Sequence, residues 1–188
     1  MSELILEPNA VASWHRVVSE AAVRVRYPLD EDRESYLVFM LQRYLARPEM
    51  VRSVLAMQFL EGLGDRGRVR SEHLRDVGDQ CLLFAGLFPG QAERRRVNPD
   101  YFIDLGRSAY TVVAEGSAAA LAALYHSLAE AFAALADVLF ALRGDPSTPL
   151  LGALDAAEQA VGRSGPLGHA ELARYTDATP VAGNTVRH

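Results

Sequence analysis

Apolar residues recur at spacings of three and four through most of this chain, and this period constrains the fold more than any other feature. Between positions 74 and 88, apolar residues at such spacings are Leu74, Val77, Cys81, Phe84 and Phe88. An α-helix turns once in 3.6 residues, so this spacing places the five side chains on one helical face. No segment shows the alternation that is typical of a strand. The sequence therefore predicts an all-α protein with no sheet.

Capping and breaking residues predict where the helices begin and end. Asn98-Pro99-Asp100 supplies a cap, a proline at the first helical position and an acid in the first turn, so a helix should run from there to about Glu115. Weaker signals predict four earlier helices, separated by proline or glycine and, at 64–70, by the polar loop GDRGRVR. They run from Asn9 to about Arg26, from about Asp30 through the apolar run 36–41, from about Glu49 to Leu63, and from Ser71 to Phe88.

The longest predicted helix runs from Ser117 to Arg143. Its apolar positions alternate steps of four and three, which is the pattern of a heptad seam and favours near-parallel packing on another helix. The seam residues are Leu121, Tyr125, Leu128, Phe132, Leu135, Leu139 and Leu142. Exposed parts of this seam, or the C-terminal segment, would suit a homodimer.

Length and composition favour a single helical domain. The 188 residues suit one domain, which we place at 1–175 as a bundle of six to eight helices, with its core at 9–143, weaker helices at 149–175 and a tail at 176–188. The net charge of −5 excludes the basic field that nucleic-acid binding requires. No apolar run of membrane-spanning length and no signal peptide is present, so we expect a cytoplasmic protein. Cys81, the one cysteine, is expected to be a buried core residue.

Two segments carry a resemblance to known sequences. DVGDQCLLFAGLFP at 76–89, followed by VNPDYFIDLGRSAY at 97–110, resembles an uncharacterised family of helical bacterial proteins. The resemblance extends over roughly 30–115 and implies a bacterial source. The family has no established activity, so the resemblance lends no catalytic residues.

Three glycines fall inside these predicted helices. Gly78, Gly86 and Gly106 each cost about 1 kcal/mol relative to alanine in a helix interior, so a packing contact should offset that cost. Gly78 and Gly106 should each face the backbone of a neighbouring helix at short range. We therefore expect a closely packed helical hairpin, in preference to a ligand lying against the glycines.

A polar cluster on the two helices of this hairpin is the main candidate site. Its members are Asp76, Asp79, Tyr101, Asp104 and Tyr110. One interpretation is a buried structural network, completed by Tyr110 or by Arg107, and the other is a small-molecule pocket. The ligand spacings of zinc and di-iron sites are absent, as are the nucleophile elbow and phosphate-binding loops. We expect no cofactor and no stoichiometric transition metal.

Three consecutive arginines, Arg94, Arg95 and Arg96, precede the helix that begins at Pro99. They either pair with nearby acids or bind an acidic protein partner. Asp100 in the first turn would repel a phosphate, and an acidic chain with one short basic patch does not suit nucleic acid. Together these features favour a non-enzymatic protein-interaction or regulatory module. The alternative is a ligand-binding or enzymatic protein with a pocket among the second, fourth and fifth predicted helices.

Overall fold

The computed structural model describes residues 8–46, 55–88 and 97–143. These residues form helices and connecting turns and contain no strand, which confirms the all-α prediction. The arginines at 94–96, the predicted helices at 149–175 and the tail at 176–188 lie outside the described residues. The helices are α1 (Pro8–Arg24), α2 (Glu31–Ala46), α3 (Leu55–Gly64), α4 (Gly67–Gly86), α6 (Pro99–Glu115), α7 (Ala119–Glu130) and α8 (Phe132–Arg143).

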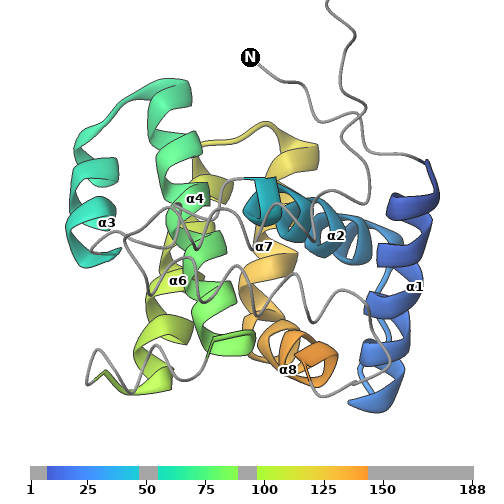
Figure 1. Cartoon of the computed structure of the whole chain (residues 1–188). Helices are drawn as coiled ribbons and strands as arrows, with labels where there is room; N and C mark the ends of the chain where they lie inside the picture. The colour runs from blue at the N-terminus through green and yellow to red at the C-terminus, as the bar shows by residue number, and fades with distance from the viewer. Residues whose placement is uncertain (1–7, 47–54, 89–96, 144–188) are drawn as a thin grey trace, which may run out of the picture.

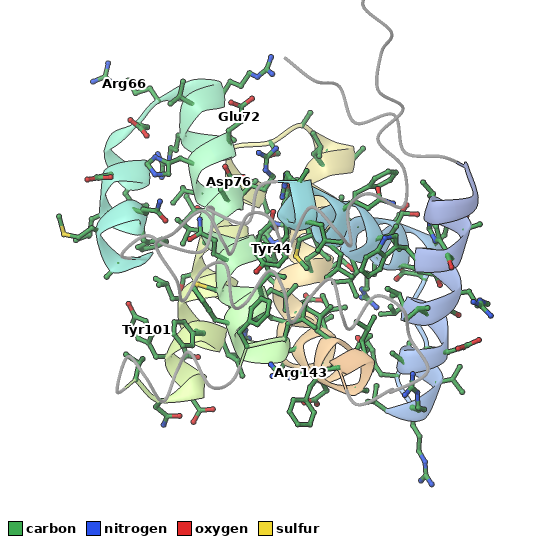
Figure 2. All side chains as sticks on the ribbon, in the orientation of Figure 1. Tyr44, Arg66, Glu72, Asp76, Tyr101 and Arg143 are labelled. Carbon is green, nitrogen blue, oxygen red and sulfur yellow. The ribbon has the colours of Figure 1, made fainter. Side chains whose placement is uncertain are left out.

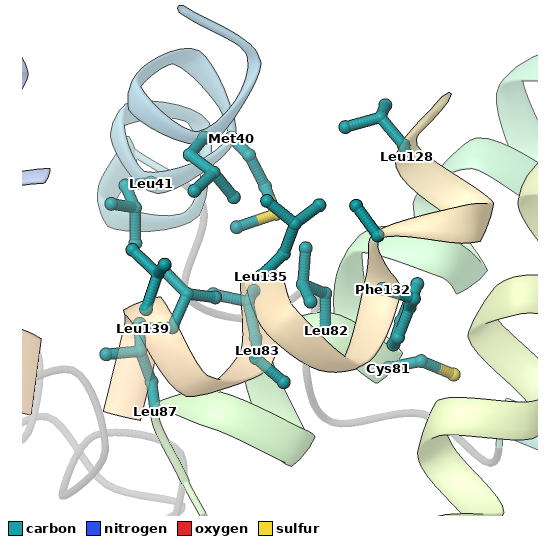
Figure 3. Packing of buried hydrophobic residues seen from close by; sticks show 14 of the residues in the cluster. Met40, Leu41, Cys81, Leu82, Leu83, Leu87, Leu128, Phe132, Leu135 and Leu139 are labelled. Carbon is teal, nitrogen blue, oxygen red and sulfur yellow. The ribbon is translucent and has the colours of Figure 1, made fainter. Parts of the chain in front are cut away.

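Helix α4 lies at the centre of the arrangement. It runs beside α6 and also packs against α3 and α8, while α1 packs on α8 and α2 (Figure 1). α3 and α1 lie at opposite edges of the described helices (Figure 1). Side chains from α2, α4 and α8 meet in the apolar core, among them Leu41, Leu83 and Leu139 (Figure 3).

The start of α6 agrees with the sequence prediction. The Asn98 side chain accepts a hydrogen bond of 3.1 Å from the backbone amide of Asp100, and Pro99 occupies the first turn. The cap satisfies an amide that would otherwise lack an intrahelical partner. The predicted starts of two other helices, α1 and α4, were wrong. α1 already includes Asn9, because it begins at Pro8, and α4 begins at Gly67 instead of Ser71.

The segment 67–70 is therefore helical and not a loop. The guanidinium of Arg68 pairs with Glu72 four residues later at 2.5 Å, a spacing at which opposite charges stabilise a helix. Gly67 has φ of +55°, a conformation that residues with a side chain rarely adopt. This glycine lets the chain turn sharply from α3 into α4 and begin a new helix at once.

The single helix predicted for 117–143 was wrong. The chain bends by 70° between α7 and α8, at Ala131. The two halves bury their apolar faces against different neighbours, since α7 packs mainly on α6 whereas α8 packs on α4 and α1. The seam is therefore not continuous, and its first member, Leu121, is 51% exposed.

No single helix within the described ranges is both long and apolar enough to cross a bilayer. The bent pair of α7 and α8 meets that criterion only when the two helices are taken together.

Candidate functional site

Asp79 lies in the middle of α4 and is completely buried, in a stretch of the helix whose residues 77–84 are all buried. A carboxylate that leaves water without partners is strongly destabilising. The position therefore requires donors from neighbouring helices, and α2 and α6 supply them.

Two phenols and one guanidinium contact this carboxyl group. The hydroxyl groups of Tyr36 on α2 and Tyr110 on α6 each donate a hydrogen bond of 2.6 Å to the Asp79 Oδ1 atom. The guanidinium of Arg43, also on α2, forms an ion pair with Oδ2. Tyr36 and Arg43 are seven residues apart, two turns of one helix, so a single face of α2 reaches both carboxylate oxygens. We call these four residues the Asp79 network.

Aromatic rings enclose the phenol side of the network. The ring of Tyr36 meets the rings of Tyr110 and Tyr125 edge-on, with centroids 5.9 and 5.8 Å apart. The ring of Tyr110 also contacts the rings of Tyr125 and Phe132, with centroids 5.6 Å apart in each pair. Such offset and edge contacts are the favourable geometries for aromatic pairs, and they restrict how the phenols can move. The rings thus hold both hydroxyl groups in place against Asp79.

Burial determines the protonation of the phenols. It raises the pKa of Tyr36 well above its usual value, and the neighbouring phenols of Tyr110 and Tyr125 raise it further. Burial likewise raises the pKa of Tyr110. Both groups therefore stay protonated and act as hydrogen-bond donors to Asp79 at physiological pH. Neither is a general base, so the geometry suits a structural lock better than proton-transfer chemistry.

The glycines predicted to pack closely do so, but against rings and not backbone. A methyl group on Gly78 would overlap the ring of Tyr110, and one on Gly106 would overlap the ring of Phe132. The expected backbone contact occurs instead at Gly86, where an added methyl group would come within 2.7 Å of the Ala136 carbonyl oxygen. Gly78 thus makes room for the ring whose hydroxyl group binds the adjacent residue, Asp79.

The structure brings together two of the five residues predicted as a polar cluster, Asp79 and Tyr110. Asp76 is partly exposed and pairs with its neighbour Arg75 at 2.8 Å. Tyr101 lies near the start of α6, away from Asp76 (Figure 2), and its exposed ring packs on Phe102.

Asp104, the fifth member of the predicted cluster, is also exposed. It lines a shallow surface hollow of about 510 Å³ together with Arg107, Ser108, Thr111 and Val112. Arg107, named as a partner for the buried acid, is thus exposed and outside the network. The ligand-pocket interpretation of the five residues stays a prediction.

Sequence reasoning missed Tyr36 and Arg43. Their spacing of seven within a helix was available as a signal, but nothing local indicates that this face of α2 meets α4. Cys81, by contrast, is buried as predicted. Burial raises the pKa of its thiol, which therefore stays protonated and unreactive.

A second feature is a row of exposed apolar side chains on helix α3, which packs on α4 at one edge of the described helices. Met57, Leu60 and Leu63 are 56%, 64% and 37% exposed, and they recur every three residues along the helix. The other side of α3 packs on α4, where Gly62 fits against Leu74. Helix α3 is therefore apolar on both sides, and we call the three exposed residues the α3 face.

The described residues contain no group of three or more histidine, cysteine, aspartate or glutamate side chains that could hold a metal ion. Comparison of the chain with protein-family models, with curated proteins and with solved structures found no match. The function of the chain must therefore be inferred from the chemistry and exposure of its own side chains.

Proposed function

We propose that this chain is a non-enzymatic protein-interaction module, which binds a partner protein through the α3 face. The observation that carries the proposal is the exposure of Met57, Leu60 and Leu63 on one helix. Contiguous apolar surface in contact with water is unfavourable, and in native proteins it typically marks a binding surface. Its role would then be regulatory, since the chain would act on the partner protein by binding it.

The position of α3 supports this proposal. The helix lies at one edge of the described helices (Figure 1) and packs chiefly on α4, so its outer side is not part of the core formed by α2, α4 and α8. Apolar side chains at steps of three on one helix are typical of a helix that binds in an apolar groove.

The Asp79 network supports a non-enzymatic role. Its carboxylate is already bonded to two phenols and a guanidinium, and the pKa of each phenol is raised by burial. Cys81 is buried and its thiol stays protonated. The most polar part of the interior thus offers neither a free base nor an activated nucleophile.

The proposal is tested by comparing two surface substitutions. A tagged full-length chain, expressed in the cells that produce it naturally, should elute in a complex larger than the chain itself. Leu60→Glu should abolish that complex, because a carboxylate cannot enter an apolar groove without losing its hydration. Leu121→Glu is the matched control, since Leu121 is 51% exposed on α7, and it should leave the complex intact. A complex that survives Leu60→Glu contradicts the proposal.

A second candidate function is small-molecule binding beside α2, and two buried donors favour it. The Gln42 Nε2 and Arg43 Nε atoms have no hydrogen-bond partner among the described residues. Buried donors are ordinarily satisfied, so a carbonyl or carboxylate oxygen of a ligand would suit them. Native mass spectrometry of the freshly purified chain tests this: a bound small molecule that Gln42→Leu releases would favour it, and the bare mass of the chain would contradict it.

A further inference from the structure

We propose that a hollow between α4 and α6 binds a small aliphatic zwitterion, a molecule with one carboxylate and one ammonium group. Residues of α4 between positions 67 and 74, and residues between 112 and 116 at the end of α6, line this hollow, which we call the α4–α6 hollow. It is separate from the α3 face and from the Asp79 network. Its size, its two charged side chains and its apolar lining together indicate the chemistry of the ligand.

The antiparallel packing of α4 and α6 creates the hollow. The two helices run side by side in opposite directions, so the first turns of α4 lie beside the last turn of α6 (Figure 1). Gly67 and Gly116 are among the lining residues, and neither carries a side chain that would fill the space. The volume is about 350 Å³, which lies within the range of small-molecule sites. The hollow can therefore hold a small ligand.

One cation and one anion line the hollow from the two helices. The partly buried Arg70 comes from α4, and the exposed Glu115 comes from α6. Neither side chain forms an ion pair or a hydrogen bond among the residues that the structure describes. Hydrogen bonds between ionised groups are the strong ones, and a zwitterion can form one with each side chain at once. The hollow thus offers a guanidinium to a carboxylate and a carboxylate to an ammonium group.

Two apolar side chains complete the lining. Leu74 is fully buried and Val112 is partly buried, and both contribute to the hollow. Small-molecule sites typically combine an apolar lining with a few polar groups that fix the orientation of the ligand. A short hydrocarbon chain between the two charges fits this lining. A phosphate or a simple cation fits less well, because Glu115 would repel the first and Arg70 the second.

Ligand-observed NMR titration of the purified full-length chain tests the proposal. The probes are L-valine, γ-aminobutyrate and ε-aminocaproate, which place their two charges progressively farther apart. We expect at least one of them to bind with a Kd of about 1 mM or below. The best probe is then compared with the analogues that lack one charge, which for γ-aminobutyrate are butyrate and butylamine. Each analogue should bind at least about tenfold more weakly, because it loses one charged hydrogen bond.

Substitutions in the hollow locate the bound probe. Arg70→Gln and Glu115→Gln should each weaken binding at least about tenfold, with an unchanged circular dichroism spectrum. Gly116→Leu should abolish binding, because a Cβ atom at Gly116 would lie 3.8 Å from the Ser71 hydroxyl oxygen and a longer side chain would fill the hollow. The φ of −92° at this glycine accommodates leucine. Arg107→Gln, at an exposed cation of α6 outside this hollow, is the matched control and should leave the Kd unchanged.

Each other outcome overturns the proposal. The absence of binding by all of the probes at about 10 mM, tenfold above the expected Kd, refutes a zwitterion site. An analogue with one charge that binds as tightly as the zwitterion shows a site for a simple ion. Binding that survives both Arg70→Gln and Gly116→Leu lies outside the α4–α6 hollow. If Gln42→Leu then removes it, the probe binds at the donors beside α2 instead.

Discussion

The centre of α4 and the outer side of α3 each reverse the usual distribution of polar and apolar groups. At the centre, a fully buried carboxyl group is bonded to two phenols and a guanidinium from two other helices. On α3, three large apolar side chains are exposed to solvent. Buried polar groups and exposed apolar patches are the two informative exceptions to ordinary burial.

The two regions differ in whether the unusual groups have partners within the described residues. The Asp79 carboxylate finds its partners inside the chain, two phenols and a guanidinium, so the network serves the stability of the fold. The apolar groups of the α3 face are exposed among the residues that the structure describes, and the proposed function assigns them a partner protein. The comparison teaches that the most polar buried site need not be the functional site. Substitutions in the two regions test this division, and the largest expected effect on the free energy of unfolding comes first.

The largest effect is expected at Asp79. Asp79→Ala should lower the free energy of unfolding by about 3–5 kcal/mol, because it leaves the Arg43 guanidinium and two phenols without their acceptor. Urea denaturation measures the loss. Asp104→Ala, at an exposed acid on α6, is the control and should change stability by no more than about 0.5 kcal/mol. Equal effects at the two positions would show that the network does not stabilise the fold.

The next effect is expected at Gly78. Gly78→Ala should destabilise the chain by about 1–3 kcal/mol, although alanine is the better helix former, because the added methyl group overlaps the ring of Tyr110. Gly64→Ala is the matched control, since its methyl group would meet no atom within 4 Å beyond its chain neighbours and the backbone of its own helix. Thermal melting should show a lower midpoint for the first variant and an unchanged or higher one for the second. A stabilised Gly78→Ala would mean that the centre is loosely packed.

The buried phenols should make the folded chain less stable at alkaline pH. Because burial raises the pKa of Tyr36 and Tyr110 above the usual value of 10, the folded chain keeps protons that the unfolded chain releases. The contribution of the two phenols to the free energy of unfolding is complete below about pH 10. Above that pH it declines by about 1.4 kcal/mol per pH unit for each phenol. Denaturation at a series of pH values measures the slope.

The variant Tyr36→Phe isolates one of the two phenols. It should remove about half of the alkaline slope, while its stability at neutral pH is measured separately to account for the lost hydrogen bond. An unchanged slope in this variant would mean that Tyr36 ionises as freely in the folded chain as in the unfolded one.

The smallest effect on stability is expected at the α3 face. Leu60→Gln should change the free energy of unfolding by no more than about 0.5 kcal/mol, because Leu60 is 64% exposed and contributes little to the core. The same substitution at Leu128, which is fully buried, should cost about 2–5 kcal/mol. A large loss at Leu60 would mean that its side chain is buried within the chain, and the comparison between the two regions would fail.

The sequence predicted those features that depend on near neighbours in the chain. The spacing of Leu74, Val77 and Cys81 reports one face of a helix, and the cap at Asn98 acts within three residues, so both were confirmed. Gly78 and Gly106 correctly indicated close contact, because a glycine inside a helix requires some compensation wherever the helix lies. What the two glycines would contact was wrong, since a missing side chain carries no information about its neighbour.

Only the tertiary structure decided how the helices meet. The heptad pattern at 117–143 could not reveal the bend at Ala131, because both halves keep the helical period while burying against different helices. Likewise, Tyr36 and Arg43 join Asp79 across 43 and 36 positions of sequence, and no local rule specifies which face of α2 meets α4. The same holds for the α3 face. The sequence places apolar residues on more than one side of α3, and only the position of the helix at the edge leaves Met57, Leu60 and Leu63 exposed. Helices are fixed by hydrogen bonds and side chains a few residues apart, whereas a buried network and an exposed face depend on contacts between distant segments.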